Sequence, residues 1–561
     1  MDKEYLRYLY GKVRREPETG IKERRVVMLP VEENVRLKTI LYVPEGVSYG
    51  PVIFTRSCYP QTEELLTIHG EEYCKRGYFF CYQWCRGLGG SEGVWEPNVY
   101  ERRDGLASLQ WICKQSFTES VGYWGSSYLA YNGWCMADAV PEKVKTMYLG
   151  VYGTDRHISA YQDGLFRHDI LTAWAMENAG FVIEADYEKS CLHRPQQEVD
   201  VDIWGQKIEW YREWILSPDA DAYYWNQGMW KELREIPGKV KIPIFIREGW
   251  YDHHLGGALA AWKSLNTESA LHSILQIGPW NHDYKPAIMQ GTEKLLDDQI
   301  SSPFQWFERI LRNKEQPQKE VLLYVIGADR WEKWSKFPVP VKKWEKLYMD
   351  FSRKKDRAYR LVKKAGEVVK GKTEFIYDPE NPVYSHGAES LFHTKKEIGS
   401  ILQEPCGFRD DVVSLLSEAF FEDCEINGEI KIRLFVSSDA EDTAFSVKVI
   451  EVFPDGRAVN IRTGITTLAY RNGADRRQIY QPGEIVEITI SLWSIAWKIE
   501  KGSCLRVDIS SSDFPQYAVH TNYPGEWAIQ KHAKKAIQRI YSQIGSLCEV
   551  ELPLVDNKGR K

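Results

Sequence analysis

The stretch Ser120-Val121-Gly122-Tyr123-Trp124-Gly125-Ser126-Ser127-Tyr128-Leu129-Ala130 decides the fold of the first half of the chain. Its first part is rich in β-branched and aromatic residues, which favour a strand. Gly125 gives the backbone room for a sharp bend. The residues from Ser127 to Ala139 are mostly small or apolar and favour a buried helix. The stretch therefore predicts a strand that passes through a tight turn into a helix, with Ser127 at the turn.

A serine at such a turn is presented at the end of a sheet, as in the nucleophile elbow of α/β-hydrolases. The usual elbow pattern is Gly-x-Ser-x-Gly, and here Leu129 replaces the second glycine. The complete pattern Gly46-Val47-Ser48-Tyr49-Gly50 lies in a predicted loop between two strands, and Ser91 follows two glycines without a helix start. Because strand, turn and helix occur in order at Ser127, we predict that Ser127 is the nucleophile rather than part of an ordinary buried turn.

Length and composition place the chain among large globular proteins. A chain of 561 residues is expected to form about two to four domains. The hydrophobic content of 43% is typical of a globular protein. The net charge of −6, without a basic stripe, argues against a nucleic-acid-binding protein. The first residues lack an apolar signal region, and no stretch of about 18 apolar residues predicts a membrane span. The 11 scattered cysteines favour reduced thiols and a cytoplasmic location.

Apolar segments and helical patterns divide the chain into four parts. Buried strands, a helix at 104–112 and the elbow predict the first part of an α/β-hydrolase domain over residues 1–154. Residues 155–238 are mostly helical and rich in aromatics, which indicates a cap inserted over the end of the sheet. Strands at 242–246 and 273–277 predict the second part of the hydrolase domain, residues 239–320.

The remaining residues, 321–561, show short alternating strands and little helical signal. Alternation predicts antiparallel sheets with one face in water, and a jelly-roll-like β-sandwich fits best. The strands that carry this prediction are 320–325, 429–436, 444–450, 485–490 and 504–509.

A serine nucleophile needs a base, and the base needs an orienting group. In α/β-hydrolases the order along the chain is serine, carboxylate, histidine. Asp252 directly follows the strand at 242–246, and His282 directly follows the strand at 273–277. Since sites in such sheets lie at the carboxyl ends of strands, we predict Asp252 as the orienting carboxylate and His282 as the general base.

Two donors are needed for the oxyanion of the tetrahedral intermediate. The backbone amide of Tyr128 is one candidate, and the hydroxyl of Tyr59, in the loop after the third strand, is the other, although a packed loop aromatic is at least as common. Adjacent His253 and His254 suggest a metal site, but neighbouring side chains of an extended chain point apart. Cys81 and Cys85 lack the second pair of a zinc site, and the glycine-rich loop at 85–93 lacks a phosphate-loop pattern. We expect neither a metal nor a cofactor.

Several motifs together resemble the CocE/NonD family of serine hydrolases, which includes cocaine esterases, X-Pro dipeptidyl-peptidases and α-amino-acid ester hydrolases. They are 56–59 (Arg-Ser-Cys-Tyr), 86–93 (Arg-Gly-Leu-Gly-Gly-Ser-Glu-Gly), 125–128 (Gly-Ser-Ser-Tyr), 249–252 (Gly-Trp-Tyr-Asp) and 278–282 (Gly-Pro-Trp-Asn-His), with 409–412 and 437–443 in the C-terminal half. The resemblance implies the roles given above for Ser127, Asp252 and His282, and an oxyanion hole made by Tyr59 and the Tyr128 amide.

Two cysteines depart from the family pattern. Cys58 stands where proline is frequent, and Cys85 stands where an aspartate usually precedes Arg86, which could loosen the loop around that arginine.

We therefore predict a serine hydrolase that cleaves carboxylic esters, with a small-molecule ester or short peptide as substrate. A dipeptidyl-peptidase or α-amino-acid ester or amide hydrolase is the first alternative, and it needs carboxylates that bind a free amine; Asp163, Glu177, Glu184 and Asp186 are available, although solvated helix faces explain them equally well. A non-catalytic carbohydrate-binding protein is the second alternative. No nucleic acid or membrane partner is expected, and the sequence is compatible with a homo-oligomer.

Overall fold

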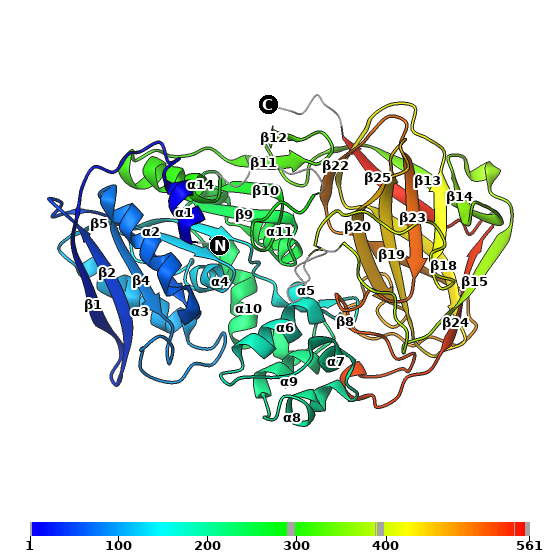
Figure 1. Cartoon of the computed structure of the whole chain (residues 1–561), viewed down its shortest axis with the longest axis horizontal. Helices are drawn as coiled ribbons and strands as arrows, with labels where there is room; N and C mark the ends of the chain where they lie inside the picture. Colours follow the sequence, from blue (N-terminus) through cyan, green and yellow to red (C-terminus); the bar gives the residue numbers. More distant parts are fainter. Residues whose placement is uncertain (1–2, 289–297, 388, 390–397, 544, 556–561) are drawn as a thin grey trace.

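A ten-stranded sheet organises the first half of the chain in the computed structural model, which describes residues 3–288, 298–387, 389, 398–543 and 545–555. The central strands are parallel, and antiparallel strands flank them at both edges (Figure 1). In spatial order they are β1 (Ile21–Glu32), β2 (Val35–Pro44), β4 (Phe79–Trp84), β3 (Gly50–Ser57), β5 (Thr118–Ser126), β6 (Val144–Gly150), β9 (Ile244–Tyr251), β10 (Ile274–Asn281), β11 (Glu320–Val325) and β12 (Arg330–Trp334).

Helices cover both faces of this sheet. On one face Ile53 packs in a cluster with α1 (Lys3–Tyr10), α2 (Glu63–Lys75) and α14 (Asp298–Phe307). On the other face its neighbours Val52 and Phe54 pack with α3 (Glu101–Lys114), α4 (Tyr128–Trp134) and α11 (Leu255–Ser264), and α12 (Thr267–Ala270) follows α11. Successive side chains of a strand point to opposite faces, which explains why every residue of β3 is buried and why this strand is apolar almost throughout.

The helical insertion follows β6 and lies at the junction of the two halves of the molecule (Figure 1). It confirms the mostly helical character predicted for this stretch, although its helices are short. A small hairpin, β7 (Tyr161–Gln162) with β8 (Leu165–Phe166), interrupts them. The helices are α5 (Arg156–Ala160), α6 (His168–Asn178), α7 (Tyr187–Leu192), α8 (Val199–Asp202), α9 (Glu209–Ile215) and α10 (Gly228–Glu235). Among the described residues, no helix combines the length and the apolar character needed to cross a membrane.

The C-terminal part is an all-β domain, as predicted. Its strands pair antiparallel, except that β14 and β16 are parallel. The strands of its 13-stranded sheet, in the part of the chain described, are β13 (Val341–Lys355), β14 (Ala358–Val362), β15 (Gly371–Tyr377), β16 (Val413–Ser417), β17 (Cys424–Gly428), β18 (Lys431–Ser438), β19 (Ala444–Val452), β20 (Ala458–Thr467), β21 (Val486–Ser491), β22 (Ile495–Ile499), β23 (Cys504–Ser510), β24 (Ala536–Ser542) and β25 (Glu549–Val555).

Two expectations about this part are wrong. The strand at 320–325, predicted as the start of the β-sandwich, is β11, and it pairs in parallel with β10 in the α/β sheet. The all-β sheet begins only with β13. Not every predicted strand has one face in water either, because β23, predicted at 504–509, is buried at all but its first residue. Alternation indicates how a strand is covered, but it does not tell which sheet the strand joins.

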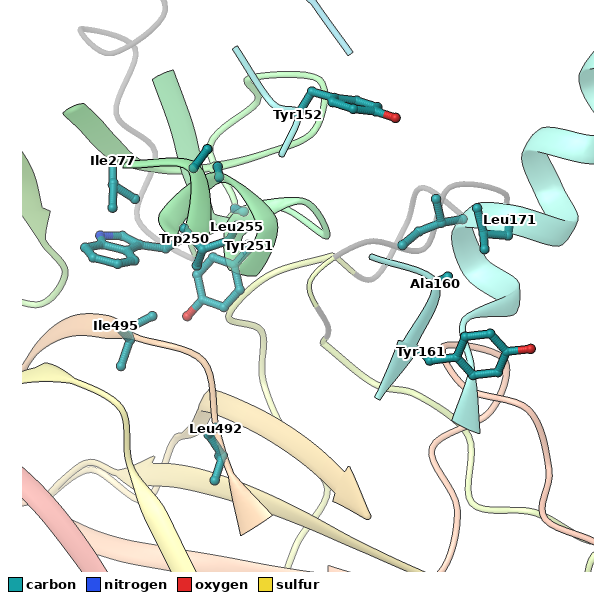
Figure 2. Close-up of a cluster of buried hydrophobic side chains, with 14 of the residues drawn as sticks. Tyr152, Ala160, Tyr161, Leu171, Trp250, Tyr251, Leu255, Ile277, Leu492 and Ile495 are labelled. Atoms are coloured by element: carbon teal, nitrogen blue, oxygen red, sulfur yellow. The ribbon is translucent and has the colours of Figure 1, made fainter. Parts of the chain in front are cut away.

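The all-β domain supports the strand end that carries Asp252. Figure 2 shows Trp250 and Tyr251, from the end of β9, in one apolar cluster with Leu492 and Ile495 of the all-β domain. Arg462 donates to the carbonyl of Trp250 over 2.5 Å, and the Tyr251 hydroxyl donates to the carbonyl of Ile461 over 3.2 Å. The backbone just before Asp252 is therefore fixed by contacts from the other half of the chain.

The elbow helix is shorter than predicted. The pattern indicates a helix from Ser127 to Ala139, but α4 ends at Trp134. Beyond it the chain continues in turns, with the amides of Met136 and Ala137 bonded to carbonyls three residues earlier. These residues stay buried, so their apolar character reflects packing rather than a continued helix.

Candidate active site

The turn at Ser127 holds its serine in an unusual backbone conformation. Its φ is +56° and its ψ is −129°, a combination that residues other than glycine rarely adopt. The Ser127 amide donates to the carbonyl of Gly150 over 3.0 Å, and the Ser127 carbonyl accepts from Ala130 and Tyr131 at the start of α4. These bonds anchor the turn to the neighbouring strand β6 and to the helix behind it.

Gly125 does not form the sharp bend that we predicted at this position. The sharp bend lies at Ser127, whereas Gly125 belongs to β5. A Cβ on Gly125 would lie only 2.3 Å from the carbonyl oxygen of Leu129. Glycine is thus required because the helix backbone returns so close to the strand, and not because the chain bends there.

Ser127, His282 and Asp252 meet although they are far apart in the sequence. Nε2 of His282 lies 2.8 Å from the Ser127 hydroxyl oxygen, and Nδ1 lies 2.6 Å from a carboxylate oxygen of Asp252. The other carboxylate oxygen of Asp252 accepts the amide hydrogen of His254 over 2.7 Å. Because the carboxylate accepts a hydrogen bond from the protonated Nδ1, Nε2 is left as the acceptor that faces the serine hydroxyl.

The surroundings of His282 favour its protonated form. Burial by itself would lower the pKa of the imidazole, but the charge of Asp252 and its hydrogen bond outweigh burial, and the pKa is raised. An imidazole that takes up a proton readily can remove one from a nearby hydroxyl. This is the property that a general base at this position needs.

Two hydrogen-bond donors lie beside the serine. The hydroxyl of Tyr59 lines the same cavity, accepts the indole hydrogen of Trp174 over 3.0 Å and interacts with the Ser127 side chain. Burial raises the pKa of Tyr59 well above its usual value, so this hydroxyl keeps its proton. The amide of Tyr128 is at the first position of α4, and in the described part of the chain no carbonyl accepts its hydrogen.

Three residues that the sequence analysis did not single out hold Tyr128 in place. Its hydroxyl donates to buried Glu101 over 2.6 Å and accepts the amide hydrogen of Asn98 over 2.8 Å. Its ring stacks on Trp174, with ring centres 6.0 Å apart. The sequence carries no signal for these contacts, because each joins segments from different parts of the chain.

His253 and His254 lie closer together than predicted. Their ring centres are 4.3 Å apart, and the ring of His253 stacks on that of His282 at 4.4 Å. The expectation that they point apart assumed an extended chain, whereas Asp252 to His254 form a turn before α11. Burial, and then neighbouring positive charges, lower the pKa of both histidines well below the usual value, so both are neutral.

The ligand atoms of Asp252, His253 and His282 lie within 4.8 Å of one another, which a metal ion could span. The arrangement does not suit one well. The stacked rings of His253 and His282 direct their nitrogen lone pairs in similar directions rather than toward a common point. The Asp252 carboxylate already accepts two hydrogen bonds.

The cavity beside Ser127 is small, about 30 Å³. Residues from the insertion and from the loops at the strand ends line it: Tyr59, Asn98, Ser127, Tyr128, Tyr152, Arg156, Ile170, Trp174, His253, His254 and His282. None of the four carboxylates considered for binding a free amine is among these lining residues. Asp163 lines a separate cleft and Asp186 caps α7, while Glu177 and Glu184 lie elsewhere in the insertion.

The loop around Arg86 is not loosened by Cys85. Two nitrogens of Arg86 donate to the carboxylate of Asp104 over 3.0 and 2.6 Å, and a third donates to Glu32. Asp104 and Glu32 thus hold the Arg86 side chain by hydrogen bonds, and Cys85 is a buried thiol.

The fold and this arrangement define an α/β-hydrolase with the site of a serine hydrolase. Residues 33–284 match the family model of the X-Pro dipeptidyl-peptidase (S15 family), and residues 313–541 match that of the X-Pro dipeptidyl-peptidase C-terminal non-catalytic domain. Cocaine esterase from Rhodococcus sp. (strain MB1 Bresler) is 26% identical over 570 residues, covering 94% of this chain and 98% of that protein. The chain belongs to the CocE/NonD family of serine hydrolases.

Solved structures show the same fold over nearly the whole chain. An aminopeptidase from a marine sediment Thaumarchaeota archaeon has a TM-score of 0.80 at 21% identity, covering 96% of this chain and 97% of that one. An α-amino acid ester hydrolase has a TM-score of 0.81 at 18% identity, covering 96% and 98%. At these identities the likeness concerns the fold alone.

Proposed function

We propose that the protein hydrolyses carboxylic esters through an acyl-enzyme intermediate on Ser127. The observation that carries the proposal is the hydrogen-bonded chain from the Ser127 hydroxyl through His282 to Asp252, with distances of 2.8 and 2.6 Å. The relationship to a cocaine esterase over nearly the full length supports an ester substrate.

In the first half of the reaction, His282 takes the hydroxyl proton while the Ser127 oxygen attacks the ester carbonyl. The carbonyl oxygen becomes an oxyanion, and the Tyr59 hydroxyl and the Tyr128 amide donate hydrogen bonds to it. Asp252 keeps the imidazole oriented and stabilises its positive charge. His282 then gives the proton to the leaving alcohol, and the acyl group stays on Ser127.

In the second half, water takes the place of the alcohol. His282 removes a proton from the water as it attacks the acyl carbonyl, and the same two donors hold the oxyanion. The bond between the acyl carbon and the Ser127 oxygen then breaks, His282 returns the proton to that oxygen, and the carboxylic acid leaves.

An active-site-directed fluorophosphonate tests the proposal. It should label the native protein and fail to label Ser127→Ala, while Ser126→Ala should still be labelled. Ser126 is a matched control because it is the adjacent residue and its hydroxyl bonds with that of Tyr284. Labelling of Ser127→Ala, or full ester turnover by it, would refute the assignment.

Comparing a p-nitrophenyl ester with Gly-Pro-p-nitroanilide separates esterase from dipeptidyl-peptidase activity. We expect the ester to be the better substrate, because no carboxylate among the described residues lines the cavity to bind a free amine. Faster release from the anilide would favour the peptidase.

We also propose a cytoplasmic location, and the eleven cysteines, all free, support it. Cell fractionation with an antibody against the protein tests this proposal.

A further inference from the structure

Arg156 is a buried positive charge in the candidate active site without a matching negative one. It belongs to α5 of the insertion, lines the cavity together with Ser127, and is 8% exposed. Its Nε has no hydrogen-bond partner, and its guanidinium lies over the ring of Trp214 at 5.1 Å. In the described part of the chain no carboxylate forms an ion pair with it.

Other groups engage the carboxylates in this region: Asp155 accepts the amide hydrogens of His157 and Ile158, and Glu101 accepts the hydroxyl hydrogen of Tyr128. The charge of Arg156 lowers the pKa of several uncharged groups, among them the hydroxyls of Tyr131, Tyr152 and Tyr224 and the neutral imidazoles of His253 and His254. Among the described residues, no carboxylate lines the cavity. Asp252 lies behind His282, and its oxygens are taken up by that ring and by a backbone amide.

An unpaired buried charge is unfavourable, and proteins normally match such a charge with a partner. A guanidinium is well suited to bind a carboxylate through two parallel hydrogen bonds. A cationic group in the same cavity would be repelled by Arg156 and would find no carboxylate to offset that repulsion. The charge of the cavity therefore selects the charge of the ligand.

We infer that the natural substrate is an ester that carries a carboxylate or a comparable anionic group, and that Arg156 binds this group. The inference rests on the proposed ester hydrolysis at Ser127 and names its substrate class. Half-esters of dicarboxylic acids and esters of hydroxy- or phenol-carboxylic acids have this chemistry. The cavity volume of about 30 Å³ accommodates only one or two water molecules, so lining side chains must move when any substrate binds.

Two pairs of esters test the inference, each differing only in charge. The first pair places the charge on the acyl side: 4-nitrophenyl hydrogen glutarate and its methyl ester. The second pair places it on the leaving group: 4-acetoxybenzoate and its methyl ester. In at least one pair we expect kcat/KM to be roughly 10- to 100-fold higher for the anion, the range that a charge-assisted hydrogen bond supplies.

In Arg156→Met, the ratio of kcat/KM for the anionic ester to kcat/KM for its methyl ester should be close to one, because only the anion loses a partner. The neutral methyl ester is the internal reference. Lys231→Met is the matched control: it also removes one positive charge from the insertion, but from an exposed site on α10, and it should keep the ratio. Equal ratios in the native enzyme and Arg156→Met, or a native preference for the neutral esters, would overturn the inference.

Inhibition of the native enzyme gives a second measurement that does not depend on the variant folding. Glutarate should compete with a neutral ester at concentrations at least tenfold lower than glutaramide does, and equal inhibition by the two would contradict the inference. The two proposals fail separately. If no ester of either charge is hydrolysed by folded protein, ester hydrolysis itself is refuted; if neutral esters are hydrolysed without any anion preference, only the role of Arg156 is refuted.

Discussion

The backbone conformation of Ser127 stores strain, and two substitutions at this position can measure it. With φ at +56° and ψ at −129°, the backbone of Ser127 adopts a conformation that is favourable almost only for glycine, because a Cβ is crowded there. Ser127→Ala and Ser127→Gly both remove the hydroxyl and its hydrogen bond to His282. The difference in unfolding free energy between the two variants therefore isolates the effect of the Cβ.

The Ser127→Gly variant should be more stable to unfolding than Ser127→Ala. A non-glycine residue in such a conformation costs about 1–3 kcal/mol, whereas glycine loses about 0.5–1 kcal/mol through the greater freedom of the unfolded chain. The unfolding free energy of Ser127→Gly should thus exceed that of Ser127→Ala by about 1 kcal/mol. At Ser264, the last helical residue of α11, the same pair of substitutions should show the opposite order, by up to about 1 kcal/mol.

Urea unfolding at equilibrium is the appropriate assay. For a cooperative chain of this length, about 1 kcal/mol shifts the melting temperature by only about 1 °C, so denaturant midpoints resolve the difference better. Neither Ser127 variant should retain ester hydrolysis. If Ser127→Gly is no more stable than Ser127→Ala, the turn is not strained and the reasoning is wrong.

Four further outcomes follow from the site and its surroundings. Tyr59→Phe should lower kcat roughly 10²- to 10³-fold with little change in KM, since it removes one oxyanion donor; a change confined to KM in steady-state kinetics would contradict that role. Asp252→Asn should lower kcat about 10⁴-fold, because the imidazole of His282 loses its orienting acceptor; a decrease of less than tenfold would exclude this role for Asp252. The raised pKa of His282 should place the acidic limb of the kcat/KM profile above about pH 6.5, with activity rising as the base loses its proton; a limb below that value would refute this prediction. His69 and His168 are buried with pKa values lowered to about 3 by burial, so unfolding takes up protons and stability should fall between about pH 6.5 and pH 3; urea midpoints should show this fall, and it should be shallower in His168→Phe.

Local sequence patterns were sufficient for most of the α/β scaffold. The predicted helix at 104–112 lies within α3, and the predicted strands at 242–246 and 273–277 overlap β9 and β10. Such features depend on neighbouring residues, whose apolar spacing reports directly on burial. The placement of Asp252 and His282 after consecutive parallel strands also follows from chain order, because the carboxyl ends of parallel strands meet at one edge.

Features set by distant parts of the chain could not be predicted in this way. The strand at 320–325 has the alternation expected of a β-sandwich, yet its partner is β10. The reason for Gly125 is the return of the helix backbone, which no local pattern reveals. Likewise, the contacts of Glu101 and Trp174 with Tyr128 depend on the tertiary arrangement of separate segments.

The indole of Trp174 connects the helical insertion to the chemistry at the sheet. Its N–H fills an acceptor position on the Tyr59 oxygen, which leaves the hydroxyl hydrogen of Tyr59 available for other acceptors. An engineer who wishes to change selectivity by grafting the insertion of a relative onto this scaffold would remove that N–H together with the pocket walls. Such chimeras should lose turnover as well as change selectivity, unless the transplanted segment brings its own donor to the same place.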